Sequence, residues 1–239
     1  MKDMNSWLLL SLFTAHLVGD FYCQNDKLCR QKEAFKIKSR FLYAHSLIIG
    51  ILSWIMVPQT GFIIYAFVIA VSHWLIDLSK LYCKERLSVF IFDQLLHIAV
   101  ILAVSVIYDA TDILPLQKID NSFSLSISLP LLIAGVLFCC KPTNILIKKV
   151  LQKYQLGEGA SCKNMRNAGA LIGSLERLLT LIFVLIGQYG AIGFVIAAKS
   201  ILRFKDSDTD RTEYVLVGTL LSFGIAIAVG LITVKIKMQ

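Results

Sequence analysis

The chain has 239 residues, of which 56% are hydrophobic and 17% are charged, and its mean hydropathy is +0.70. A soluble domain carries about a quarter charged residues, so this composition excludes an ordinary soluble domain and indicates a helical membrane protein. The formal net charge is +8. Lys and Arg are concentrated in a few loops, which predicts contact with membrane lipid and not with nucleic acid.

Eight apolar segments follow one another along the chain, and most have close to the ~20 residues that a spanning helix needs. They are residues 6–24, 41–57, 61–82, 89–108, 126–147, 168–187, 189–204 and 213–234. No small-residue cleavage site follows the first segment, so we expect a retained helix there and not a cleaved signal peptide. We predict an all-α polytopic transmembrane protein with about eight membrane segments. The segment at 189–204 is short, and either a full span or a re-entrant piece fits it.

The loops predict the organisation and the orientation of the chain. A polar stretch at 109–125 separates a four-helix transmembrane bundle at 1–108 from a second helical membrane half at 126–239. Basic loops alternate with non-basic ones, as the positive-inside rule requires of a multi-spanning protein. The most basic loop is 25–40, which follows the first segment, so the N-terminus is expected outside the cytoplasm.

All four histidines lie in the first four segments, and three of them have an aspartate four residues away. The pairs are His16 with Asp20, His73 with Asp77, and His97 with Asp93, while His45 stands alone. A spacing of four places both side chains on one helix face, one turn apart. In the fourth segment the aspartate precedes the histidine, whereas in the first and third segments it follows the histidine. This helix is expected to run in the opposite direction to the other two. We therefore expect the aspartate of every pair to lie near the cytoplasm and the histidine to lie deeper.

This pattern predicts a divalent metal site in the bundle, near the cytoplasmic face. Imidazole and carboxylate are ligands for zinc, which we favour, and also for manganese and iron. A bound ion would also offset the cost of burying ionisable groups in a bilayer. The alternative is that the pairs only hold helices together by polar packing. The predicted ligands are His16, Asp20, His45, His73, Asp77, Asp93 and His97.

A metal beside the basic 25–40 loop favours hydrolysis of a lipid-linked or membrane-proximal phosphate or ester substrate. Asp20 or Asp93 would then serve as a ligand or as a general base. Contact with the substrate or a lipid head group is predicted for Gln24, Lys80, Arg177, Lys199 and Arg203. Two alternatives stay open: an ion- or metal-coupled transporter, and a non-catalytic membrane scaffold.

Two of the remaining polar side chains have alternative interpretations. Lys80, one turn from Asp77, also fits a topology anchor at the membrane surface. Glu176 lies inside an apolar segment, so a partner among Arg177, Lys199 and Arg203 is expected for it. The second half therefore predicts an internal ion-pair network.

Four parts of the first half carry a resemblance to a known family. They are HLVGDFYCQ at 16–24, His45, HWLIDLSK at 73–80 and DQLLH at 93–97. Together they resemble the bacterial integral-membrane family catalogued as domain of unknown function 3307. The runs GSLERLL at 173–179, AIGFVIAAKSILRF at 191–204 and EYVLVGTLLS at 213–222 resemble its longer members. The resemblance implies a location in the bacterial inner membrane and brings no established activity.

Overall fold

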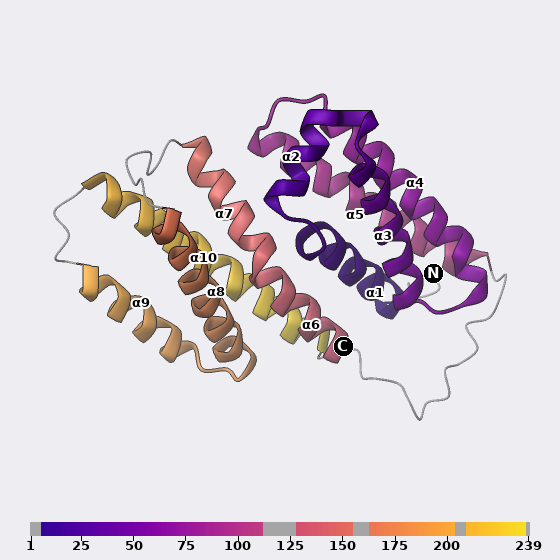
Figure 1. Cartoon of the computed structure of the whole chain (residues 1–239). Coiled ribbons are helices and arrows are strands. Elements are labelled where there is room, and N and C mark those ends of the chain that lie inside the picture. The colour runs from indigo at the N-terminus through magenta and orange to yellow at the C-terminus, as the bar shows by residue number, and fades with distance from the viewer. Residues whose placement is uncertain (1–5, 112–127, 155–162, 204–208, 238–239) are drawn as a thin grey trace. The chain divides into compact units, whose positions relative to one another are not determined.

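The computed structural model describes residues 6–111, 128–154, 163–203 and 209–237 (Figure 1). At 128, 163–168, 202–203, 209–212 and 237 it describes the backbone alone. The regular structure of these parts is entirely helical, as predicted. The chain divides into two compact units, Met1–Ala134 and Gly135–Gln239, which are described separately. Most of the predicted 109–125 linker lies outside the described residues.

The first unit is a closed bundle of four helices. In chain order its elements are α1 Ser6–Leu17, the π-helix η1 Val18–Tyr22, α2 Asp26–Phe35, the 3₁₀ turn η2 Lys36–Lys38, α3 Arg40–Met56, the 3₁₀ turn η3 Thr60–Phe62, α4 Ile63–Lys80 and α5 Leu87–Ala110. Helix α1 packs on α3 and α5, α3 packs on α4, and α4 packs on α5, which closes the ring (Figure 1).

Part of the interior of this bundle is polar, whereas large apolar side chains lie on its outer surface. On α4, His73 and Asp77 are buried, whereas Phe67 is 69% exposed. On α5, Asp93 is buried and its neighbour Phe92 is 63% exposed. Exposed aromatic and aliphatic side chains around buried ionisable ones suit a bundle whose outer surface meets lipid.

Helices α3 and α4 approach closely because Gly50 has no side chain. A Cβ at Gly50 would lie 2.9 Å from Ala70 Cβ and 3.2 Å from the Ala66 carbonyl oxygen. Small residues of this kind allow helices in membranes to pack backbone against backbone. Away from the histidines, the core is apolar and includes Leu8, Leu12 and Phe62.

The segment predicted as a basic loop at 25–40 is mostly helical. The Asn25 side chain caps α2 by accepting a hydrogen bond from the Leu28 amide at 3.0 Å. Lys36, with a φ of 46°, ends the helix. The chain then turns by 105° between α2–η2 and α3. Sequence reasoning missed this helix because its charged residues outweigh its few apolar ones.

The second unit is also helical. Its elements are α6 Ser128–Cys139, which crosses the boundary between the units, α7 Lys141–Lys153, α8 Lys163–Leu185, α9 Tyr189–Arg203 and α10 Thr209–Lys237. Helix α10 packs on α7 and α8, and α9 packs on α8. Val184, Ile192 and Phe223 form part of the core between α8, α9 and α10.

The structure supports fewer membrane spans than the eight predicted. Four helical stretches of the described chain are long and apolar enough to cross a membrane: Thr60–Lys80, Leu87–Ala110, Leu129–Lys153 and Glu213–Ile236. A fifth is reached if α2–η2 and the bent α3 count as one span. The regular helices α1 and α9 have only 12 and 15 residues. Several long apolar helices therefore make this a multi-pass membrane protein with four or five candidate spans.

Candidate metal centre

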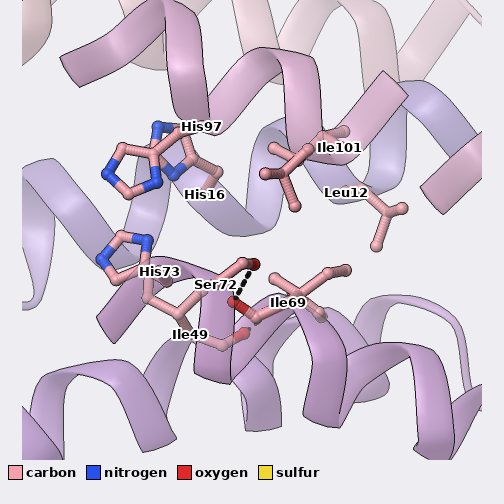
Figure 2. A pocket seen from close by; sticks show the side chains of 10 residues that line it. Leu12, His16, Ile49, Ile69, Ser72, His73, His97 and Ile101 are labelled. Atoms are coloured by element: carbon pink, nitrogen blue, oxygen red, sulfur yellow. Dashed lines mark hydrogen bonds between the residues drawn. The ribbon is translucent and has the colours of Figure 1, made fainter. Parts of the chain in front are cut away.

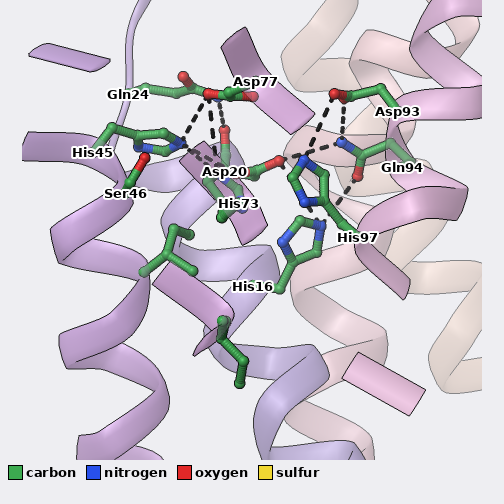
Figure 3. A network of polar contacts seen from close by, with 12 residues as sticks. His16, Asp20, Gln24, His45, Ser46, His73, Asp77, Asp93, Gln94 and His97 are labelled. Atoms are coloured by element: carbon green, nitrogen blue, oxygen red, sulfur yellow. Dashed lines mark hydrogen bonds and ion pairs between the residues drawn. The ribbon is translucent and has the colours of Figure 1, made fainter. Parts of the chain in front are cut away.

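The seven predicted ligands come together inside the first unit. Each is at most 6% exposed, although the residues come from α1, η1, α3, α4 and α5 (Figure 3). Figure 3 also shows Asp77 and Asp93 along one side of the cluster and His16 on the other. Asp20 lies between these two sides, in contact with His45 and His73, so the cluster does not divide into separate layers of aspartate and histidine.

Three atoms in the middle of the cluster form a nearly equilateral triangle. Asp20 Oδ1 lies 3.2 Å from His45 Nε2 and 3.2 Å from His73 Nε2. The two Nε2 atoms lie 3.2 Å from each other. Ligands held at 2.0–2.1 Å in a tetrahedral zinc site are separated by about 3.4 Å. The triangle thus has nearly the size of one face of a metal coordination sphere.

Hydrogen bonds alone do not satisfy this triangle. An imidazole Nε2 carries at most one hydrogen, which points in one direction. If both His45 and His73 donate to Asp20 Oδ1, the contact between their nitrogens brings two donors together. If one histidine donates to the other instead, neither Nε2 can donate to the carboxylate, because the donor has used its only hydrogen and the acceptor has none. A single cation bound to all three atoms satisfies every contact at once.

Asp20 reaches the triangle from a π-helical turn. The Cys23 amide donates to the Val18 carbonyl at 3.0 Å, which is the i→i+5 pattern of a π-helix. Such turns are rare in proteins, and a large share of those that do occur lie at functional sites. Gly19 permits the approach of this turn to α3, because a Cβ there would lie 2.0 Å from Ile49 Cδ1. The sequence predicted a regular helix at this point, so the π turn is a finding of the structure.

Two lysines neutralise the other two carboxylates. Lys32 Nζ, from α2, donates to Asp77 Oδ2 at 2.7 Å, and Lys80 Nζ donates to Asp93 Oδ2 at 2.6 Å. Among the described residues, Asp20 makes no such bond to a lysine or arginine. Its negative charge is therefore left to the histidines or to a bound cation.

Gln94 connects the two sides of the cluster. Its Nε2 donates to Asp20 Oδ2 at 3.2 Å and to Asp93 Oδ2 at 3.1 Å, and its Oε1 lies 3.4 Å from His16 Nε2. Gln24 does not extend the triangle, because its side-chain amide donates to the Asp20 backbone carbonyl. A head-group contact by Gln24 stays a prediction.

His16 and His97, the two histidines outside the triangle, group with His73 in a second part of the cluster. The rings of His73 and His97 stack with centroids 4.2 Å apart, and the His16 ring lies 5.0 Å from that of His97. Ligand atoms of these three residues all lie within 4.8 Å of one another. Figure 2 shows them beside a cavity of about 10 Å³, whose lining includes Leu12 and Ile101. This volume suits about one water molecule.

The predicted polar residues of the second unit belong to a separate network. Lys199 Nζ donates to Glu176 Oε2 at 2.6 Å, which resolves the expected pairing of Glu176. Arg177 is 2% exposed and donates to the Cys139 and Cys140 carbonyls and to three side chains, Ser222, Asn144 and Ser174. The Arg203 side chain lies outside the described part of the chain. Head-group contact by these residues stays a prediction.

Lys32 is the site residue that sequence reasoning did not single out. It was one of six basic residues between 25 and 40, and nothing in their order marks it. Helical periodicity places Leu28 and Lys32 on one face of α2, but the same pattern occurs in surface helices. Its burial follows from the packing of α2 against the bundle.

The fold and this cluster define a class: a helical membrane protein with buried His/Asp groups that can hold a metal ion. Residues 8–121 match the model of a family described as protein of unknown function (DUF3307). This match confirms the resemblance seen in the motifs of the first half, and the resemblance of the second half stays a prediction. Neither a curated protein nor a solved structure is significantly similar to the chain.

Proposed function

We propose that this protein is a metal-dependent membrane hydrolase whose metal ion is bound by Asp20, His45 and His73. The observation that carries the proposal is the triangle of 3.2 Å contacts among their ligand atoms. Two histidines and one carboxylate are the protein ligands of several hydrolytic zinc sites, where a further position stays open for substrate or water. Zinc is the preferred ion, with manganese or iron as alternatives.

The charges around the triangle support the binding of a cation. Asp20, Asp77 and Asp93 contribute three negative charges, and Lys32 and Lys80 balance two of them. With neutral histidines the buried cluster keeps one negative charge, centred on the residue that also contacts His45 and His73. A divalent ion compensates this charge inside a low-dielectric bundle, where an unpaired charge is costly.

The same lysines support an anionic substrate. Lys80 lies at the exposed edge of the cluster, since its side chain is 37% exposed while that of Asp93 is 2% exposed. An ammonium group beside a metal ligand set suits a phosphate ester, whose oxygens accept hydrogen bonds from lysine. A bound metal ion would polarise the phosphoryl or carbonyl oxygen of the substrate. The proposed substrates are lipid-linked or membrane-proximal phosphates or esters, which reach the site from the membrane.

Asp20 and Asp93 were the predicted catalytic carboxylates, and their surroundings suit different roles. Asp20 is surrounded by imidazole nitrogens and suits a ligand. Asp93 binds Lys80 and Gln94 through Oδ2 and keeps Oδ1 free of hydrogen bonds within the described structure. Oδ1 faces His97 Nε2 at 3.6 Å, a position that suits binding of a proton or a cation.

A second candidate function is an ion or metal carrier. Three groups of ligand atoms follow one another through the cluster and share His73 and His97. Overlapping sites of this kind can pass an ion from one group to the next. The orientation of the chain, with the cluster near the cytoplasmic face, is part of both proposals.

The test begins with the full chain purified in detergent. Metal content is measured by inductively coupled plasma mass spectrometry for the wild type, Asp20→Asn, His73→Phe and the control Ser53→Ala. Ser53 is buried in α3, and its hydroxyl donates to the Ile49 carbonyl at 2.8 Å. We expect about one ion per chain in the wild type and in the control, and a loss in the other two. Equal, negligible metal in all four would end the proposal.

The activity is then measured with detergent-dispersed lipid phosphates and lipid esters. Hydrolysis that a chelator removes and added zinc or manganese restores would support the hydrolase. Metal flux into liposomes without hydrolysis would favour the carrier. The Ser53→Ala protein should match the wild type in either assay.

A further inference from the structure

Two buried ligand atoms face each other beside the triangle and have no hydrogen-bond partner among the described residues. They are Asp93 Oδ1 and His97 Nε2, on successive turns of α5, and they lie 3.6 Å apart. Each residue is 3% exposed. At 3.6 Å the two atoms are within ion-pair distance of each other but too far apart for a normal hydrogen bond, and buried polar atoms nearly always form hydrogen bonds. A cation between the two atoms would satisfy both.

We propose that Asp77, Asp93 and His97 bind a second divalent cation beside the first. This inference rests on the proposed metal site at Asp20. One ligand atom from each of the three residues lies within 4.8 Å of the other two. The 3.6 Å between Asp93 and His97 is close to the separation of about 3.4 Å between two ligands of a tetrahedral ion. The chain then carries a two-metal site of the kind that clamps phosphate oxygens in phosphatases and nucleases.

The neighbours of Asp93 suit a ligand. Its Oδ2 accepts hydrogen bonds from Lys80 and Gln94, which hold the carboxylate and leave Oδ1 pointing to His97. Ligating carboxylates are usually oriented by such hydrogen bonds to the atom that does not bind the metal. Gln94 also bonds Asp20, so one side chain links the ligands of both ions.

The two ions connect through their histidines. His73 belongs to the first ligand set and His97 to the second, and their rings stack with centroids 4.2 Å apart. The paired metal ions of phosphoryl-transfer enzymes lie about 3.5–4 Å apart. Two ions held by these adjacent residues would both contribute to binding the oxygens of one phosphate.

The charge balance predicts unequal affinities. The cluster has one negative charge before any ion binds, so the first divalent ion leaves one positive charge and the second leaves three. The second ion therefore binds more weakly, by at least about tenfold. A bound phosphate would remove most of this repulsion, so inorganic phosphate should tighten the second step by about tenfold or more.

Titration of the metal-free full chain with Mn²⁺ tests the proposal. Free Mn²⁺ and the spin coupling between bound ions are both read by electron paramagnetic resonance, with and without inorganic phosphate. We expect two steps in the wild type, the second shifted to lower Mn²⁺ by phosphate and accompanied by spin coupling. Asp93→Asn and His97→Phe should keep the first step and lose the second. Phenylalanine preserves a ring against His73 but offers no ligand atom.

The control variant is Ser105→Ala, which lies deeper in α5. Ser105 is buried and donates to the Ile101 carbonyl at 2.8 Å, away from the cluster. It should bind two ions as the wild type does, and size-exclusion profiles and thermal unfolding should show that all variants are folded.

Each other outcome has a distinct meaning. A single step in the wild type, even with phosphate, would overturn the second site and leave the first intact. A second step that persists in both Asp93→Asn and His97→Phe would do the same. The absence of any bound ion would overturn the proposed function itself.

Discussion

The two units of the chain both bury charged side chains among apolar helices, but they compensate them differently. In the second unit, Arg177 directs its donors to carbonyl and side-chain oxygens, and Glu176 is bonded to Lys199. In the first unit, Asp20 has no ammonium partner among the described residues, and Asp93 and His97 keep atoms without hydrogen bonds. A buried polar network whose groups lack partners costs a large free energy in a membrane interior. The second network therefore fits a structural role, and the first fits a site that a ligand completes.

The strongest way to break this contrast is to remove the central carboxylate. Asp20→Asn keeps the shape of the side chain and deletes the charge between His45 and His73. Breaking a buried charge pair costs about 3–5 kcal/mol, so metal affinity should fall by roughly 10²–10⁴-fold. Competition titration with a metal-binding dye measures this change. Affinity within a few-fold of the wild type would show that the triangle does not bind the ion.

The matching change in the second unit is Arg177→Met. It removes five hydrogen bonds from Arg177, each worth about 0.6 kcal/mol in a membrane protein. The free energy of unfolding should therefore fall by about 3 kcal/mol, measured by unfolding in mixed micelles.

Metal content provides the control for that variant, and it should stay at the wild-type level. A stable Arg177→Met protein, or one that loses metal, would contradict the assignment of a structural role to the second network.

Gly50→Ala tests whether the bundle geometry supports the cluster. The added methyl group would meet Ala70 and the Ala66 carbonyl, so α3 and α4 must separate. Overpacking of this kind costs about 1–3 kcal/mol. We expect reduced thermal stability together with weaker metal binding, since His45 and His73 lie on these two helices. Gly169→Ala is the matched control, because nothing lies within 4 Å of a Cβ there.

Lys32→Met sharpens the comparison in the opposite direction. The ammonium group of Lys32 forms an ion pair with Asp77. Its positive charge therefore weakens the attraction between Asp77 and a bound metal ion. Its removal should tighten metal binding by about tenfold, which is ~1.4 kcal/mol. Isothermal titration with Zn²⁺ measures the change against Lys38→Met, which replaces an exposed lysine of the same segment. Weaker binding in Lys32→Met would mean that α2 supports the site instead of opposing the ion.

The smallest effect is expected for Glu176→Gln. The side chains of Glu176 and Lys199 are 17% and 27% exposed, so their ion pair is partly screened. Its loss should cost about 0.5 kcal/mol, within the range measured for exposed pairs. The same unfolding assay checks this value, and a loss as large as that of Arg177→Met would show a deeper role for the pair.

Much of the helical layout could be predicted from periodicity and hydropathy. The segments expected at 41–57, 61–82 and 89–108 agree with α3, η3–α4 and α5 to within about two residues. Of the eight predicted spans, four or five meet the requirements of length and hydropathy in the described residues. The amphipathic α2 was missed, since a short charged helix has no signal that distinguishes it from a loop.

The candidate ligands could also be named in advance, because buried His and Asp in apolar helices are rare and expensive. Which of these ligands contact one another could not be predicted from the sequence. Spacing predicted three pairs within single helices, such as His16 with Asp20, which lie 3.8 Å apart. The tightest group instead joins Asp20, His45 and His73 from three different elements. Contacts between helices depend on how the helices rotate against one another, and a linear pattern does not contain that rotation.

The order of residues was thus enough to predict a helical membrane protein with ligand-type side chains gathered inside the bundle of its first helices. Helical periodicity and the cost of burying charge are local properties, so they can be evaluated along a single chain. Packing alone brought Lys32 onto Asp77 and placed Asp20 against His45 and His73. These features arise from contacts between residues distant in sequence, which exist only once the bundle has closed.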